Sequence, residues 1–141
     1  MEVNIYIHQT IKGPRKGQQG YGLYILEALN PRRVPFTKVM RMQLEGSENE
    51  ASLKILKQAL SHMNQRTQLS IYIDSEWLYT ALTKWLPVWK ETGFMTAKHE
   101  KVAFAETWQQ VDEILSGQDF TVHLKEQHSY KNWMENKIIP A

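Results

Sequence analysis

The chain has 141 residues, five tryptophans, no cysteine and a formal net charge of +2. A hydrophobic fraction of 42% argues against a disordered chain. The absence of cysteine excludes a disulfide framework and thiol chemistry, and it suits a reducing compartment. We therefore expect a cytoplasmic protein, and the length is that of one domain over residues 1–141. No apolar run is long enough to span a bilayer, so we expect no membrane partner. The charge permits nucleic-acid binding without requiring it.

The first part of the chain predicts three strands. Residues 3–7 alternate apolar and polar side chains, and residues 21–27 and 37–44 form two more strands with a turn at Asn30-Pro31 between them. Residues 12–22 carry four glycines and three cations and predict a loop. This loop lacks the glycine and lysine spacing of a nucleotide-phosphate cradle.

A helix is predicted next, because Ser47 and Glu50 have the spacing of a capping box. The apolar side chains of this helix fall on one face: Leu53, Leu56, Leu60 and Met63. Residues 69–73 then predict a buried strand, rich in β-branched and aromatic side chains, that delivers Asp74 to the edge of a sheet.

The remaining chain alternates helix and strand. Residues 76–86 predict a helix that ends before Pro87, and residues 106–115 predict another that ends near Gly117. Residues 120–124 predict the last strand. Three strands followed by this alternation predict an α/β layer fold with a mixed sheet.

Several short motifs follow one another in a recognisable order: Asp74-Ser75, Trp85, Trp89, Gly93, Thr96-Ala97 and Trp108. In this order they resemble the type 1 ribonuclease H family, which has a TDS run, a helix, a W-x-x-x-W-x-x-x-G pattern, a TA pair and a tryptophan on the next helix. The resemblance covers most of the chain. It implies a ribonuclease H-like mixed five-stranded sheet with flanking helices.

The family cuts the RNA strand of an RNA–DNA hybrid with two Mg²⁺ ions held by four carboxylates. The resemblance places Asp74 at the fourth-strand carboxylate, although aspartate is also a preferred helix N-cap. His8 aligns with the first-strand carboxylate. A neutral imidazole is a poor bridge between two hard cations, so an ordinary polar role at a strand end is the expectation for His8.

The third position depends on the register of the first helix. Aligning Asn49 with the family asparagine keeps the leucines in the core and puts Ser52 at the catalytic position. Aligning Glu50 instead would place Lys54 and Lys57 in the core, where unpaired lysine is rare. We therefore prefer Ser52 and keep Glu50 as an alternative.

The fourth position falls on Met134, with Glu135 one residue further on as an alternative ligand. His128 aligns with a flexible family histidine that helps product leave. The family positions Asp74, Ser52, His8 and His128 are thus expected to be vestigial as a catalytic set. The expectation for cofactors is none, or weak binding of Mg²⁺ or Mn²⁺ at Asp74.

The resemblance also implies nucleic-acid contacts at six residues: Asn49, Trp85, Trp89, Lys90, Lys98 and Trp108. Packing within the segment is an equally good role for the tryptophans. The family holds a DNA phosphate with an arginine and an asparagine. The resemblance places Glu50 and Phe104 at these two positions, so both phosphate contacts are expected to be lost.

The expected function is a degenerate ribonuclease H-like protein that binds nucleic acid, either an RNA–DNA hybrid or another duplex, or a protein partner, without cutting. One alternative is an active Mg²⁺- or Mn²⁺-dependent ribonuclease H with His8, Glu50, Asp74 and Glu135 as ligands. A second alternative is a protein-interaction module that uses the fold as a scaffold.

Overall fold

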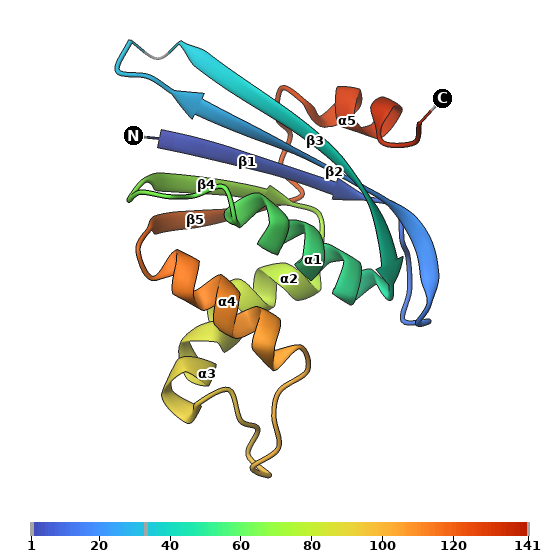
Figure 1. Ribbon diagram of the computed structural model, residues 1–141, viewed down its shortest axis with the longest axis vertical. Coiled ribbons are helices and arrows are strands. Elements are labelled where there is room, and N and C mark those ends of the chain that lie inside the picture. The colour runs from blue at the N-terminus through green and yellow to red at the C-terminus, as the bar shows by residue number, and fades with distance from the viewer. Residues whose placement is uncertain (1, 33, 141) are drawn as a thin grey trace.

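The computed structural model describes residues 2–32 and 34–140 and is built around one five-stranded sheet with the order β3-β2-β1-β4-β5 (Figure 1). The strands are β1 (Glu2–Gln9), β2 (Gln18–Leu29), β3 (Pro35–Gly46), β4 (Gln68–Ile73) and β5 (Asp119–Leu124). β1 pairs antiparallel with β2, and β2 pairs antiparallel with β3. β4 lies parallel to β1, and β5 lies parallel to β4. The predicted mixed sheet is confirmed.

Helices cover both faces of the sheet. They are α1 (Glu48–Leu60), α2 (Glu76–Thr80), the π-helical turn η1 (Ala81–Trp85), α3 (Leu86–Thr92), α4 (Ala105–Leu115) and α5 (Lys131–Lys137). In Figure 1, α1, α2 and α4 lie together below β1, and α5 lies on the other side, at the upper right beyond β3. No helix in the described part of the chain is long and apolar enough to cross a membrane.

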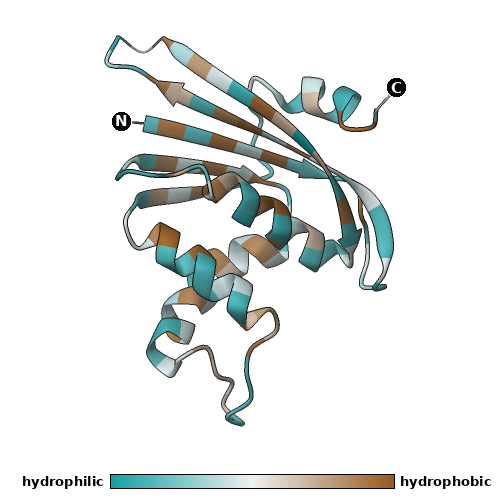
Figure 2. Ribbon diagram, viewed as in Figure 1, coloured by the Kyte–Doolittle hydropathy of each residue, from teal (hydrophilic) through white to brown (hydrophobic). Residues whose placement is uncertain are grey.

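The larger core lies between the sheet and α1, α2 and α4. Val3, Ile5 and Ile7 face it from β1, because alternate residues of a strand point to the same side. Figure 2 shows the corresponding alternation of brown and teal along β1. The intervening Tyr6 faces the other side, where it packs with Met134 of α5 in a smaller cluster.

The helix predicted over residues 76–86 does not end before Pro87. The helical path continues from α2 through the wider turn η1 into α3, which ends at Thr92. Pro87 lies in the first turn of α3, where its missing N–H and its fixed φ are tolerated. Gly93 then caps α3 with φ +67°.

The loop predicted over residues 12–22 is shorter in the structure, because β2 already begins at Gln18. Gly22 lies inside the strand, where it makes room for the helix above it. A Cβ at this position would lie 2.5 Å from Cδ1 of Ile55 and 2.8 Å from Cδ1 of Leu44. Close packing between the sheet and α1, rather than a turn, accounts for this glycine.

Candidate functional site

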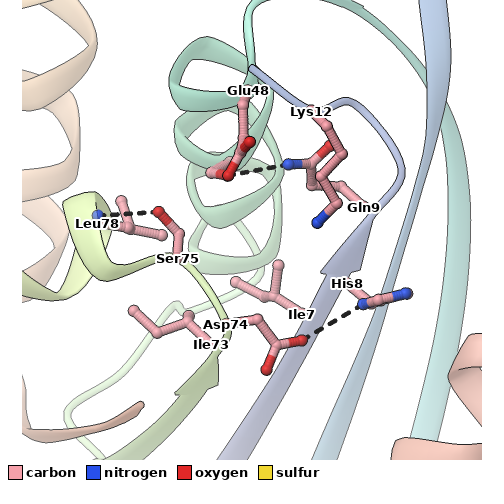
Figure 3. Close-up of a pocket in the computed structure, with 10 residues that line it drawn as sticks. Ile7, His8, Gln9, Lys12, Glu48, Ile73, Asp74, Ser75 and Leu78 are labelled. Atoms are coloured by element: carbon pink, nitrogen blue, oxygen red, sulfur yellow. Dashed lines mark hydrogen bonds and ion pairs between the residues drawn. The ribbon is translucent and has the colours of Figure 1, made fainter. Parts of the chain in front are cut away.

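His8 and Asp74 lie side by side at the ends of β1 and β4. The parallel pairing of Tyr6 with Tyr72 sets this register, because His8 and Asp74 each follow two residues later. Nδ1 of His8 lies 3.4 Å from Oδ2 of Asp74, and Figure 3 shows the two side chains facing each other. The structure therefore brings together the two strand-end residues that the sequence predicted.

The surroundings of Asp74 favour its ionised form. The hydrogen bond from His8 lowers the pKa of the Asp74 carboxyl, and this effect outweighs the opposing effect of burial. The charge of Lys131 lowers the pKa further, followed by smaller effects of His8 and His128. Asp74 is thus a carboxylate whose nearest partner is an imidazole.

A second polar pair, Gln9 and Ser52, occupies the α1 side of the same strand end. Both side chains are buried, with exposed fractions of 8% for Gln9 and 3% for Ser52. Nε2 of Gln9 donates to Oγ of Ser52 over 3.2 Å, and Oε1 of Gln9 accepts from the backbone N–H of Ile11 over 2.6 Å. These neutral groups therefore satisfy one another's hydrogen bonds, and none of them needs a bound cation as a partner.

Glu48 and Lys12 also line the cavity at this strand end; Lys12 belongs to the basic loop that the sequence shows, whereas Glu48 was not expected at the site. Oε1 of Glu48 accepts from the backbone N–H of Gly13 over 2.8 Å, while the backbone N–H of Glu48 donates to the Gly13 carbonyl over 2.9 Å. Glu48 precedes Ser52 by one helical turn, so the spacing i, i+4 was the available signal that both face the cavity.

The register of α1 agrees with the preferred alignment. Ser52 lines the cavity, whereas Glu50 pairs with Lys54 on the outside of the helix, with Nζ and Oε2 3.7 Å apart. The backbone N–H of Glu50 donates to Oγ of Ser47 over 3.3 Å, as a capping residue should. The residues expected in the core are buried: Leu53, Leu56, Ala59 and Leu60.

His128 is held near the strand ends by the loop before α5. Its Nδ1 accepts from the backbone N–H of Tyr130 over 3.2 Å, and its ring centroid lies 4.5 Å from that of Tyr6. Burial lowers the pKa of His128, the charge of Asp74 opposes this, and that of Lys131 adds to it. A neutral His128 that accepts at Nδ1 carries its proton at Nε2.

The two candidates for the fourth carboxylate position lie apart from the cavity. Met134 is buried against the α5 side of the sheet, and Glu135 is exposed on α5. Neither residue lines the cavity. Glu135 therefore does not join Asp74 at the cavity, and the described residues hold no metal-binding group that includes it.

The two Mg²⁺ ions of the ribonuclease H family do not fit these side chains. Among residues 2–32 and 34–140, no group of three or more histidine, cysteine, aspartate or glutamate side chains could hold a metal ion. His8 and Ser52 stand where bridging carboxylates would be needed, and hard cations require anionic oxygen ligands. A single carboxylate, Asp74, offers at most a weak contact.

The six residues expected to contact nucleic acid differ in accessibility. Trp108 has an exposed fraction of 0%, so its expected role as a contact is wrong, and its ring instead packs 5.5 Å from that of Trp89. Trp85 is exposed and lies 5.9 Å from Trp89. The packing role weighed for these tryptophans accounts for Trp108, and Trp85 remains available to a ligand.

The polar members of that set lie at the surface. Lys90 pairs with Asp112, with Nζ and Oδ1 3.4 Å apart, whereas Lys98 is exposed in the loop after α3. Asn49 is half-buried in the first turn of α1. Phe104, the residue that the resemblance places at the family asparagine position, is the N-cap of α4 and has a left-handed backbone with φ +60°.

Comparisons with known proteins place the chain clearly. The family model described as RNase H matches residues 3–138. A ribonuclease H of Acidovorax sp. (strain JS42) is 32% identical over 113 residues, which are 80% of this chain and 72% of that protein. Another, from Legionella pneumophila (strain Lens), is 27% identical over 146 residues and covers 100% of this chain and 93% of that protein.

The fold has solved counterparts at lower identity. LC9-RNase H1, described as a type 1 RNase H with the type 2 active-site motif, aligns with a TM-score of 0.72 at 16% identity over 91% of this chain and 64% of its own. A foamy viral protease–reverse transcriptase in complex with an RNA/DNA hybrid gives a TM-score of 0.67 at 12% identity over 97% of this chain and 19% of its own. With nearly the whole chain matched by the family model, the protein belongs to the RNase H family.

Proposed function

We propose that this protein is a degenerate member of the RNase H family that binds nucleic acid, an RNA–DNA hybrid or another duplex, without metal-dependent cleavage. The observation that supports it best is the side-chain chemistry of the strand ends. His8 pairs with Asp74, and Ser52 pairs with Gln9, at the positions where the family carries two bridging carboxylates. A two-metal mechanism needs anionic bridges to hold both ions against the scissile phosphate.

Cations beside the cavity support the binding part of the proposal. Lys12 lines the cavity, and Arg15 and Lys16 are exposed in the same loop. The two hydrogen bonds between Gly13 and Glu48 fix this loop to the start of α1. A phosphate backbone that reached the strand ends would therefore meet several positive charges, and such contacts dominate nucleic-acid affinity. The solved neighbour bound to an RNA/DNA hybrid has the same fold.

Binding is tested by fluorescence anisotropy of a labelled RNA–DNA hybrid, with EDTA present, over a series of salt concentrations. We expect affinity to fall as salt rises, and we expect the triple variant Lys12→Ala, Arg15→Ala, Lys16→Ala to flatten the slope of log K against log salt by roughly two to three. Arg66→Ala is the matched control, because Arg66 pairs with Asp119 at the opposite ends of β4 and β5. Absence of binding to the hybrid at low salt would overturn the proposal and favour a protein partner instead.

Cleavage is tested separately with the labelled hybrid and Mg²⁺ or Mn²⁺. We expect the wild type and Asp74→Asn to give the same background signal. Metal-dependent cleavage that disappears in Asp74→Asn would demonstrate an active two-metal site and overturn the proposal.

A further inference from the structure

The misfit between the strand ends and a metal pair leaves an arrangement with chemistry of its own. Nδ1 of His8 lies against the Asp74 carboxylate at 3.4 Å, so the neutral ring carries its proton on Nδ1. The other ring nitrogen, Nε2, points away from Asp74 in Figure 3, and the ion pair with Asp74 is made through Nδ1. An imidazole oriented by a carboxylate is the usual form of a general base.

Further polar groups lie in the segment that leads into α5, which packs beside Tyr6. His128 has its Nδ1 occupied by the backbone N–H of Tyr130, which leaves an Nε2–H free to donate. The ring of His128 lies 4.5 Å from that of Tyr6, which precedes His8 by two residues on β1, and Lys131 follows at the start of α5. A neutral donor and a cation beside a base are suited to an anionic phosphoryl group.

We propose that His8 acts as a general base on the 2′-hydroxyl of a bound RNA, so that the chain is cleaved by metal-independent transesterification. The proposal rests on the proposed nucleic-acid binding, since the phosphodiester must first lie across the cavity. Asp74 is the positioning residue that holds the tautomer and the orientation of the ring. His128 and Lys131 would donate to the non-bridging phosphate oxygens.

The step balances without any further reactant. Nε2 of His8 accepts the 2′-hydroxyl proton while the 2′-oxygen forms a bond to phosphorus. The bond from phosphorus to the 5′-oxygen breaks, and the leaving oxygen takes a proton from solvent as His8 returns its own proton to solvent. The products are a 2′,3′-cyclic phosphate and a 5′-hydroxyl end.

This chemistry selects unpaired RNA. The attacking oxygen must reach a position in line with the leaving oxygen, and a flexible linkage reaches that alignment more readily than one held in a duplex. DNA, which has no 2′-hydroxyl, cannot react. The paired RNA of a hybrid is therefore bound and left intact, in keeping with the proposed function.

The test uses a DNA oligonucleotide with one central ribonucleotide, incubated with the full chain in EDTA, and mass spectrometry of the product ends. We expect 2′,3′-cyclic phosphate ends from this probe and no product from its all-DNA counterpart. His8→Gln should reduce the rate by about 100-fold or more, the usual contribution of a positioned base. His99→Asn is the matched control: His99 is an exposed loop residue with φ +61°, a conformation that asparagine tolerates, so the rate should not change.

The positioning role of Asp74 has a separate signature. Asp74→Asn should lower kcat while leaving the anisotropy-measured affinity for the probe unchanged, whereas a general loss of structure would weaken both. Equal rates in the wild type and His8→Gln, or ends carrying a 5′-phosphate, would overturn the inference. Tight binding of the probe without cleavage would overturn it and leave the proposed function intact, while loss of all nucleic-acid binding would remove both.

Discussion

The two faces of the sheet are stabilised in different ways. The face under α1, α2 and α4 carries a continuous apolar core in which Trp108 is fully buried. The face under α5 has a smaller cluster around Tyr6, Leu23 and Met134, and it depends on hydrogen bonds as well. There the Glu27 carboxylate accepts hydrogen bonds from the hydroxyls of Tyr6 and Tyr130 and from the Asn4 amide.

The candidate site lies at the strand ends, where these two faces meet. His8 and Asp74 follow Tyr6 and Tyr72 on the α5 face, whereas Gln9 and Ser52 lie on the α1 face. Neither core includes the polar atoms of the site. The comparison teaches that the side chains at the strand ends are separate from both sources of the fold's stability, so they can vary without removing either.

The largest effect is expected from the apolar face. Trp108→Ala should lower the free energy of unfolding by about 3–5 kcal/mol, because it removes a fully buried indole and leaves a cavity. Urea denaturation measures the loss, and Trp85→Ala at an exposed position is the matched control. A loss no larger than that of the control would show that the core is not continuous around Trp108.

The strand ends should respond in metal affinity. His8→Asp combined with Ser52→Glu restores two carboxylates beside Asp74, and we expect Mg²⁺ or Mn²⁺ to bind at least about tenfold more tightly than to the wild type. Isothermal titration gives both affinities. Two ions bound tightly by the wild type would contradict our account of the site, and no gain in the double variant would show that the strand ends have diverged in geometry.

The polar face should respond to pH. Tyr130→Phe removes a hydrogen bond to Glu27 and should cost about 1–2 kcal/mol near neutral pH. The hydrogen bond to Glu27 raises the pKa of the Tyr130 phenol from 10.0 to about 12. The difference between wild type and variant should therefore be complete below pH 10 and vanish as the pH rises through about 12. A difference that stays constant through alkaline pH would show that the loss of stability does not come from the hydrogen bond to Glu27.

The smallest effect is expected from Asp74. The hydrogen bond from His8 lowers the pKa of Asp74 below 3.8, so its contribution to stability is present above that pH and lost as the pH falls through the lowered value. The side chain has an exposed fraction of 43%, which keeps the contribution below about 1 kcal/mol. Urea denaturation of wild type and Asp74→Asn should differ at pH 6 and converge in acid, and a gap that widens in acid would reverse the sign.

The sequence predicted the features that follow from local pattern. The alternation along β1 gave the strand, and the conflict of burying Lys54 gave the register that places Ser52 at the cavity. The predicted end of the helix before Pro87 is wrong. A proline that ends a helix and a proline in the first turn of the next helical segment give the same local sequence pattern.

Other features depend on contacts between distant elements. The bond between Gln9 and Ser52 joins β1 to α1 across 43 residues, and no periodicity within either element indicates it. Glu48 could be read as an ordinary first-turn glutamate, since acidic residues favour that position. Burial of Trp108 was equally hidden, because the helix pattern gives the face of a side chain and not its depth.

Gly22 has a consequence for engineering that reaches beyond the packing of α1. It pairs with Gln9 across β1 and β2, and a Cβ at this position would lie 2.5 Å from Cδ1 of Ile55 of α1. The missing methyl group thus lets Ile55 of α1 pack directly against β2, beside the strand end that carries Gln9. Gly22→Ala would force Ile55 or Leu44 to shift, so it offers a change beside Gln9 that alters no side chain lining the cavity.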